Sequence, residues 1–330
     1  MHLNIFLHKY HLNMEQDQKK FLIVVDGSYF QYCCLFASVK TFMDRYPDDA
    51  KCWIKPIDEC DQKNLPNILN CDNYKKCLKK QVMWKLESVE EIAKTNFQRE
   101  IDECDAIDIV FAMDDKLTHS FRKNLYPEYK AQRSLVKRQY QVYPIKDYIV
   151  EVIFKELDVE QENGYHLVKV EGAEGDDVIA TTMLKLKENY VGSMLIASDH
   201  DFLQIEGLRE FDLFGKEAKR DLGGEEVSAK DYLIGKILMG DRSDNIQQVF
   251  TRCGPKTALK WTKDKEALKK VLKEDHSLAS RYLLNKKMID FNNIPQDLSD
   301  KILKSVNESL YKNVKLNKKP AINWVDLMKL

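Results

Sequence analysis

The sequence lacks a long apolar run, a strong excess of either charge, and the C-x₂₋₄-C cysteine pairs that are typical of zinc sites. No apolar segment approaches the roughly 20 residues of a membrane-spanning helix. Residues 1–13 are interrupted by His8, Lys9 and His11, and they do not resemble a signal peptide. We therefore expect a cytoplasmic protein with no targeting signal and no membrane contact. Residues 1–20 are interpreted as a mobile N-terminal tail, and Met14 is a candidate for the true start.

The eight cysteines are scattered, and a chain of 330 residues has a core large enough to be stable without disulfides. Several of them fall in the polar, proline-containing residues 45–80, which we interpret as an insertion. These are Cys52, Cys60, Cys71 and Cys77. Their spacing favours ordinary reduced cysteines over a zinc site.

The net charge of −1 does not by itself indicate a nucleic-acid partner. Once the acids assigned below to one site are set aside, however, basic residues are in excess, and this excess can form a surface for a polyanion.

Carboxylates follow each of four short apolar runs in the sequence. The runs are residues 21–25, 107–113, 166–170 and 194–197, with 211–214 as a candidate fifth, and helical patterns lie between them. This alternation predicts an α/β fold with a mostly parallel central sheet flanked by helices. Because the carboxyl ends of parallel strands meet at one edge, we expect the acids to lie close together there. The acids after the four runs are Asp26; Asp114; Glu174, Asp176 and Asp177; and Asp199 and Asp201.

Such a cluster repels itself, at about 4 kcal/mol for like charges 4 Å apart at an effective dielectric near 20. Clustered carboxylate oxygens are what Mg²⁺ or Mn²⁺ prefers. Asp176 and Asp177 alone have another explanation, because acids in the first turn of a helix cap it and complement its dipole. The repetition after four runs favours a metal site.

Basic residues alternate with tyrosines after the second run. They include Arg122, Tyr129, Lys130, Arg133, Lys137 and Arg138. Such a stretch can hold phosphates and stack on bases. A solvated helix face is the alternative, and the stretch alone does not decide between them.

Beyond Ser228 the pattern is helical, and it is interrupted by two polar turns. The first, residues 240–245, contains Asp241 and Asp244. The second contains Gly254, Lys256 and Thr257, but Pro255 occupies the place of the second glycine that a P-loop requires. We interpret it as a tight turn between helices whose free N–H groups can hold a phosphate.

Together these residues resemble the 5′-nuclease family of flap endonucleases, phage 5′-3′ exonucleases and the 5′-nuclease domains of bacterial DNA polymerases, over about residues 21–259. Residues 288–295 further resemble the ribonuclease H of T-even-like phages. The resemblance implies a PIN-like fold in residues 21–225, with a helical arch at 116–145. It also implies a helical DNA-binding domain of helix-hairpin-helix type in residues 226–330. Arg252 departs from this pattern, because it stands where the family's turn usually has glycine.

The resemblance implies a structure-specific 5′ nuclease that removes RNA primers or flaps during DNA replication and repair. Two Mg²⁺ ions, for which Mn²⁺ can substitute, would activate water and stabilise the leaving oxygen. One ion would be held chiefly by Asp26, Asp114, Asp176 and Asp199. The other would be held by Asp201, Asp241 and Asp244. Glu174 and Asp177 would bridge the ions or act through water. Lys130, Arg133 and Arg122 would act at the scissile phosphate, whereas Tyr129, Lys137, Arg138, Gly254, Lys256 and Thr257 would hold nucleic acid.

The expected partners are DNA and RNA–DNA duplexes with 5′ ends or flaps, bound by a monomer. A sliding clamp and a single-strand-binding protein are further candidates, with Ile5, Phe6 and Tyr10 as a possible clamp anchor. The alternatives are a PIN-type ribonuclease, which lacks the segment at 240–245, and a non-catalytic DNA-binding protein, which is expected to have lost acids. A phosphoacceptor domain would need only one aspartate and a lysine.

Overall fold

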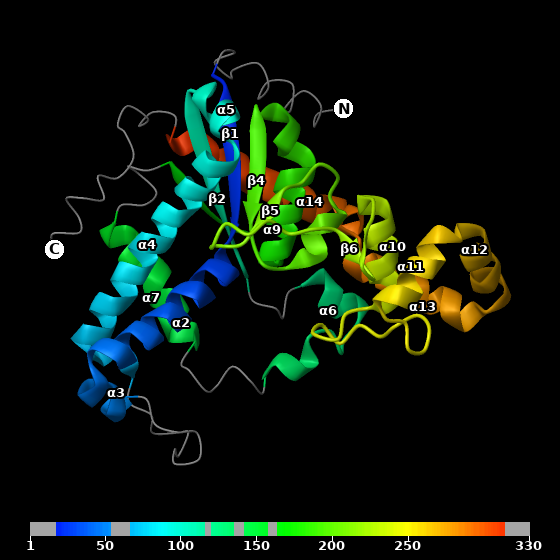
Figure 1. The fold of residues 1–330 in the computed structure, drawn as a ribbon, viewed down its shortest axis with the longest axis horizontal. Helices are drawn as coiled ribbons and strands as arrows, with labels where there is room; N and C mark the ends of the chain where they lie inside the picture. The colour runs from blue at the N-terminus through cyan, green and yellow to red at the C-terminus, as the bar shows by residue number, and fades with distance from the viewer. Residues whose placement is uncertain (1–17, 54–66, 116–119, 135–141, 158–163, 314–330) are drawn as a thin grey trace.

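A five-stranded parallel sheet with the order β3-β2-β1-β4-β5 lies at the centre of the fold (Figure 1). The computed structural model describes residues 18–53, 67–115, 120–134, 142–157 and 164–313. The strands are β1 (Lys20–Asp26), β2 (Ala106–Met113), β3 (Tyr165–Lys169), β4 (Gly192–Ile196) and β5 (Glu210–Phe211). The predicted mostly parallel sheet flanked by helices is confirmed. The fifth strand begins before the predicted run 211–214.

The strand register brings the carboxyl ends of the central strands to one edge. Asp26 of β1 pairs with Ala112 of β2, and Val25 pairs with Ile196 of β4. Residues 21–25 are fully buried because helices cover both faces of the sheet, which explains their unbroken apolar run.

One face of the sheet is covered by α2 (Gly27–Arg45), α4 (Asp72–Asn96) and α7 (Val142–Tyr148), which continues as the π-helical η5 (Ile149–Phe154). Phe111 of β2 packs edge-on against Phe30 and Phe154, with ring centroids 5.2 and 5.6 Å apart. Three short helices, α3 (Pro47–Trp53), η2 (Ile68–Asn70) and α5 (Gln98–Asp102), connect these elements.

Helix α4 begins within the predicted insertion at residues 45–80, which stays a prediction. The helix begins at Asp72, although the sequence pattern predicted a helix over 82–104, and it ends at Asn96. Tyr74, Leu78 and Val82 are buried one turn apart in the core, while lysines occupy the intervening positions and make the segment look polar. Cys71 and Cys77 are free thiols buried in this core. Cys60 and the side chain of Cys52 lie outside the described residues.

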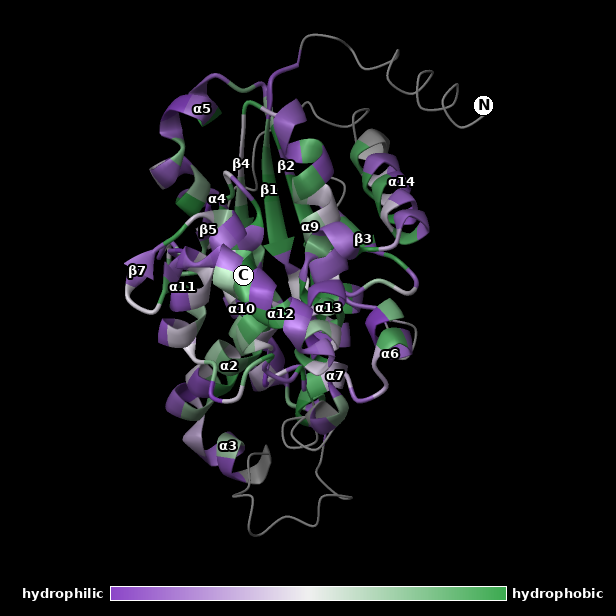
Figure 2. Cartoon of the chain, turned by 90° about the vertical axis from the view of Figure 1, so that its right-hand side faces the viewer, coloured by the Kyte–Doolittle hydropathy of each residue, from purple (hydrophilic) through white to green (hydrophobic). Residues whose placement is uncertain are grey.

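The opposite face is covered by α9 (Gly175–Leu186) and α14 (Gln296–Asn313). Leu298, Ile302 and Val306 of α14 share one buried cluster with Val178 and Met183 of α9. Figure 2 shows α14 beside β3 and α9, with hydrophilic residues along its outer side. The last described helix therefore packs on the sheet, although it lies far from the sheet in the sequence. The division of the chain at residue 225 stays a prediction.

The remaining helices, α10 to α13, gather at one end of the long axis in Figure 1. They are α10 (Ala229–Met239), α11 (Pro255–Lys263), α12 (Lys265–Glu274) and α13 (His276–Ile289), preceded by the hairpin β6 (Asp221–Leu222) and β7 (Glu225–Glu226). Leu222, Leu238, Leu259 and Leu268 form their own core. Two short 3₁₀ turns follow α9 and α13. They are η6 (Lys187–Asn189) and η8 (Phe291–Asn293).

The predicted helical arch at 116–145 falls only partly within the described residues. There it contains α6 (Phe121–Leu125), the 3₁₀ turn η4 (Ala131–Ser134) and the start of α7. Residues 1–17, which form most of the predicted tail, lie outside. Among the helices that the structure describes, none is long and apolar enough to cross a membrane.

Candidate functional site

Asp26 and Asp114 stand at the ends of the two central strands β1 and β2. Asp26 caps α2 by accepting a hydrogen bond from the N–H of Tyr29 at 3.0 Å. Asp114 accepts one from the N–H of Gly175 at 2.8 Å and another from the hydroxyl of Ser28. The hydroxyl of Ser28 in turn accepts a hydrogen bond from Lys146 of α7 at 2.7 Å. The N-termini of α2 and α9 are thereby fixed at the same edge of the sheet.

Asp199 and Asp201 follow β4 and begin the 3₁₀ turn η7 (His200–Gln204). Asp199 accepts a hydrogen bond from the N–H of Asp201 at 3.0 Å. Lys236 of α10 lies with its Nζ 2.5 Å from a carboxylate oxygen of Asp201. This ion pair joins the C-terminal helices to the edge of the sheet.

Asp241 lies in the turn directly after α10. Its Oδ1 accepts hydrogen bonds from the N–H and hydroxyl of Ser243, both at 2.7 Å, and from the N–H of Asp244 at 3.2 Å. Burial alone would raise the pKa of Asp241, but the hydrogen bonds from Ser243 and the charge of Lys236 outweigh it and lower that pKa. Asp241 is therefore held as an anion.

The acids at the sheet edge act on one another electrostatically. Burial, and then the charges of Asp114 and Asp199, raise the pKa of Asp26 to about 6 despite its hydrogen bond. Burial and the charge of Asp199 likewise raise the pKa of Asp201 to about 7. The pKa of Asp176 is raised well above its ordinary value by burial and by the charges of Asp199 and Asp26. The charges of these carboxylates therefore act on one another at the sheet edge.

Glu210, the first residue of β5, is an acid of this region that the sequence analysis missed. Its side chain is buried, and neither carboxylate oxygen has a hydrogen-bond partner among the described residues. Burial, followed by the charges of Asp199 and Asp201, raises its pKa to about 8. The signal was present but weak, because a single glutamate before the apolar run at 211–214 looks like an ordinary surface residue.

Glu174 and Asp177 pair with basic side chains that are themselves almost wholly buried. Arg122 lies with its Nη1 2.6 Å from Asp177 and 3.4 Å from Glu174. Lys130 forms an ion pair with Glu174, which also accepts a hydrogen bond from the hydroxyl of Ser120 at 2.8 Å. We call Arg122, Lys130, Glu174 and Asp177 the buried ion-pair cluster; the side chains of all four are almost wholly buried.

The charges of this cluster stabilise one another. Burial would raise the pKa of Glu174, but the charges of Lys130 and Arg122 lower it. For Lys130 the reverse holds, since burial would lower its pKa and the charge of Glu174 raises it. A buried pair of this kind costs little only while both partners are present.

Arg122 and Tyr129, which the sequence assigned to the scissile phosphate and to nucleic-acid binding, are both buried. Arg122 is only 4% exposed, and its Nε donates a hydrogen bond to the carbonyl of Met288 at 2.9 Å, so its guanidinium is occupied by the protein itself. Tyr129 is 2% exposed, packs with Ile237 and Ile289, and points its hydroxyl at Glu174, 3.3 Å away. As placed, its ring is not available for stacking on a base.

Lys130, in contrast, lies beside the open acids as expected. Its charge acts on Asp114 and Asp176, and its Nζ is 3.7 Å from Asp244. Its backbone has a φ of 55° and its N–H donates to the carbonyl of Asp244 at 3.0 Å, which ties this segment to the turn after α10.

The other predicted nucleic-acid residues lie away from the sheet edge or outside the described structure. Lys137 and Arg138 are outside it, as is the side chain of Arg133. Gly254 is the N-cap of α11, and Lys256 and Thr257 lie in its first turn. Arg252 has a φ of 58°, a left-handed conformation that favours glycine, at the position where the family's turn usually has one.

A divalent cation fits the donors that this site presents. Among the described residues, no three histidine, cysteine, aspartate or glutamate side chains are arranged so that together they could hold a metal ion. Mg²⁺, however, usually keeps several waters and binds through only one or two carboxylates. The carboxyl oxygens of Glu210 lack a hydrogen-bond partner among the described residues, and neighbouring acids add to the effect of burial in raising the pKa values of Asp26 and Asp201. Both are features that a bound cation would relieve.

Part of the chain matches a known protein family. Residues 86–230 match the family model of the 5′-3′ exonuclease N-terminal resolvase-like domain. Over this part, the chain is similar to 5′ nucleases.

Particular relatives are similar over part of their length. The 5′-3′ exonuclease of Buchnera aphidicola is 27% identical over 182 residues, which are 53% of this chain and 56% of that protein. The ribonuclease H of phage T4 is 29% identical over 158 residues, 43% of this chain and 51% of the relative. The chain thus spans about half the length of these relatives. A solved structure of the 5′-exonuclease of phage T5 superimposes with a TM-score of 0.55 at 15% identity, covering 88% of this chain and 99% of the other. That likeness shows the fold.

Proposed function

We propose that this protein is a divalent-metal-dependent 5′ nuclease that hydrolyses phosphodiester bonds at the 5′ ends or flaps of DNA and RNA–DNA duplexes. The observation that carries the proposal is the placement of Asp26, Asp176, Asp199 and Asp201 at the carboxyl edge of a parallel sheet, where the charge of Asp199 helps to raise the pKa of the other three. The site needs positive charge from outside the chain, and a phosphodiester with its bound cations supplies it.

Two groups of acids would each hold one cation. Asp26, Asp114, Asp176 and Asp199 would hold one, and Asp201 and Asp241 the other. Bound divalent ions supply a nucleophilic water at neutral pH and stabilise the charge on the leaving oxygen. We propose Mg²⁺, with Mn²⁺ able to substitute, because all these donors are carboxylates. The T5 relative has been solved with zinc ions and, as a flap endonuclease, with DNA and metal ions, which supports this proposal.

The sequence assigned Glu174 and Asp177 to the cations. In this proposal they position basic side chains of the buried ion-pair cluster instead. Glu174 orients the ammonium of Lys130 beside the open acids, where it can hold the scissile phosphate and stabilise its growing charge. Arg122 and Asp177 fix the start of α9, which carries Asp176. Asp244 pairs with Lys130 and contributes to this placement.

Duplex DNA would extend from the site toward the C-terminal helices. The positive end of the α11 dipole, with Lys256 and Thr257, would hold a phosphate of the duplex. The proposed biological role is the removal of RNA primers or flaps in replication and repair by a monomer. A sliding clamp and a single-strand-binding protein are its proposed partners.

One assay tests the proposed activity directly. Purified protein is incubated with 5′-labelled flap, nicked and RNA–DNA substrates in Mg²⁺, in Mn²⁺ and in EDTA. We expect cleavage near the 5′ end with either metal and none with the chelator. Persistent cleavage in EDTA, or an inactive wild-type protein on all three substrates, would contradict the proposal.

A further inference from the structure

Glu210 is a buried acid without a hydrogen-bond partner, and the proposed chemistry does not yet use it. It pairs with Leu195 of β4 and is 1% exposed. Its backbone carbonyl accepts a hydrogen bond from Ala218 at 2.9 Å, so the residue is fixed on the edge strand. Neither Oε1 nor Oε2 accepts a hydrogen bond from any described residue.

The surroundings of the Glu210 carboxyl are acidic. Asp199, Asp201 and Asp26 are the groups whose charges act on it. The imidazole of His200 is the nearest basic group that pairs with it, with Nδ1 3.8 Å from Oε1, beyond hydrogen-bond distance, and this histidine is exposed. The fold thus brings a fourth carboxyl group against acids that already repel one another.

Such a placement is costly for the protein alone. A buried polar group normally has a partner, and a buried carboxyl that faces other carboxylates is among the least favourable cases. Glutamine or leucine at this edge-strand position would avoid the cost. A cation or a hydrogen-bond donor from outside the chain would supply the partner that the described residues do not.

We propose that Glu210 is a positioning residue for the cation that Asp26 and Asp199 would hold, and that its carboxylate accepts a hydrogen bond from a water on that cation. The inference rests on the proposed function, because it needs the same cation. It adds to the site a residue from β5 that none of the recognised motifs contains. Groups that orient a ligand or water of a metal typically change metal affinity 10- to 100-fold when they are replaced.

The test compares Glu210→Gln with Glu206→Gln, a matched change at an exposed glutamate nearby in the sequence. Binding of Mn²⁺ to each protein is measured by calorimetry without nucleic acid, and thermal unfolding is followed in EDTA. We expect Glu210→Gln to weaken Mn²⁺ binding by about 10-fold and to leave the metal-free melting temperature unchanged or higher. Glu206→Gln should match the wild type in both measurements.

The outcomes separate the inference from the proposed function. If the wild type binds Mn²⁺ and Glu210→Gln binds it equally well, Glu210 has no part in cation binding and the inference alone fails. A lower metal-free melting temperature for Glu210→Gln would assign the residue a purely structural role, which also overturns the inference. If the wild type binds no Mn²⁺, both the inference and the proposed function fail.

Discussion

At the scale of single residues, Asp199 has the widest electrostatic effect in the site. Its charge contributes to the raised pKa values of Asp26, Asp176, Asp201 and Glu210. It is also exposed, so a cation and a substrate can reach it. Removing this one charge therefore relieves repulsion at several places and takes away a cation ligand at the same time.

We predict that Asp199→Asn lowers the single-turnover cleavage rate by about 10²-fold or more, the scale observed when one group that stabilises transition-state charge is lost. Binding of the flap substrate should change little, because phosphate contacts elsewhere remain. In EDTA the variant should melt at the same or a higher temperature than the wild type. A variant that cleaves normally, or that is clearly destabilised without metal, would show that Asp199 is not a ligand.

Most of the acids of the site could be predicted from the sequence because each follows an apolar strand. What the sequence does not show is which acids are already neutralised by the protein. Glu174 and Asp177 belong to the same motif as Asp176, and only the packing of Arg122 and Lys130 separates them from it. Lys236 and Glu210 were missed for a related reason. Each is one charged residue within an ordinary helix or a short strand, and only tertiary contact places it at the site.

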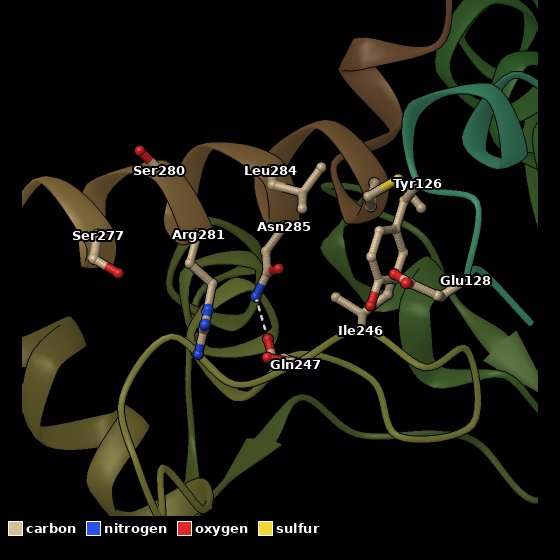
Figure 3. A pocket seen from close by; sticks show the side chains of 10 residues that line it. Tyr126, Glu128, Ile246, Gln247, Ser277, Ser280, Arg281, Leu284 and Asn285 are labelled. Carbon is tan, nitrogen blue, oxygen red and sulfur yellow. Dashed lines mark hydrogen bonds between the residues drawn. The ribbon is translucent and has the colours of Figure 1, made fainter.

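At the scale of elements, Arg122 joins three segments that are far apart in the sequence. It lies on α6, pairs with Asp177 on α9, and donates a hydrogen bond to Met288 near the end of α13. Figure 3 shows how α13 faces the neighbouring segment, with Tyr126 and Glu128 across a pocket from Leu284 and Asn285. The start of the predicted arch is thus anchored to the sheet and to the C-terminal helices.

Replacing Arg122 with methionine should lower the free energy of unfolding by about 3–5 kcal/mol, because Asp177 and Glu174 would remain buried without their partner. Arg99→Met is the matched control, since Arg99 is exposed and its Nε lies 3.5 Å from Glu103. The control should cost at most about 1 kcal/mol. Urea unfolding measures both. Equal small losses for the two variants would mean that the buried ion-pair cluster does not hold these elements together.

The central strands were predicted more accurately than the start of α4, and the pattern of burial explains the difference. Residues 21–25 and 107–113 are apolar throughout because both faces of the sheet are buried, and this pattern is unambiguous. The start of α4 is buried on one side only. Tyr74 and Leu78 there are separated by lysines that point outward, and the average composition of the segment looked like that of a loop.

At the scale of the whole molecule, α14 closes the apolar face of the sheet that α9 leaves open. Ile302 is fully buried in that cluster, whereas Leu283 on α13 is 57% exposed. Ile302→Ala should therefore lower the free energy of unfolding by about 2–5 kcal/mol, and Leu283→Ala should leave it almost unchanged. Chemical denaturation of both variants tests the difference. A negligible loss for Ile302→Ala would show that α14 contributes little to the sheet domain.

A second contact of α14 makes stability depend on pH. His166 on β3 donates its Nδ1–H to the carbonyl of Ser309 at 3.1 Å, and its Nε2 lies 3.9 Å from Asp108. Burial lowers the pKa of His166 below its ordinary value of 6.5, although Asp108 opposes this effect. The unfolded chain therefore binds this proton more readily than the folded protein does, and stability should fall as the pH drops through about 6.5.

Unfolding measured between about pH 7.5 and pH 5 tests this dependence. His166→Gln should reduce the loss of stability toward low pH, while His276→Gln, at an exposed position, should leave the profile of the wild type. Identical pH profiles for wild type and His166→Gln would exclude a contribution from this histidine.

The position of α14 also has a consequence for synthesis on the ribosome. The strands β1 to β5 are complete once Phe211 has been translated, but the helix that covers one of their apolar faces ends at Asn313. During the intervening interval the nascent chain exposes Val168 on β3 and the side of α9 that α14 covers in the folded protein. A chaperone is expected to bind this face, and fragments that stop before residue 296 should aggregate when they are produced alone.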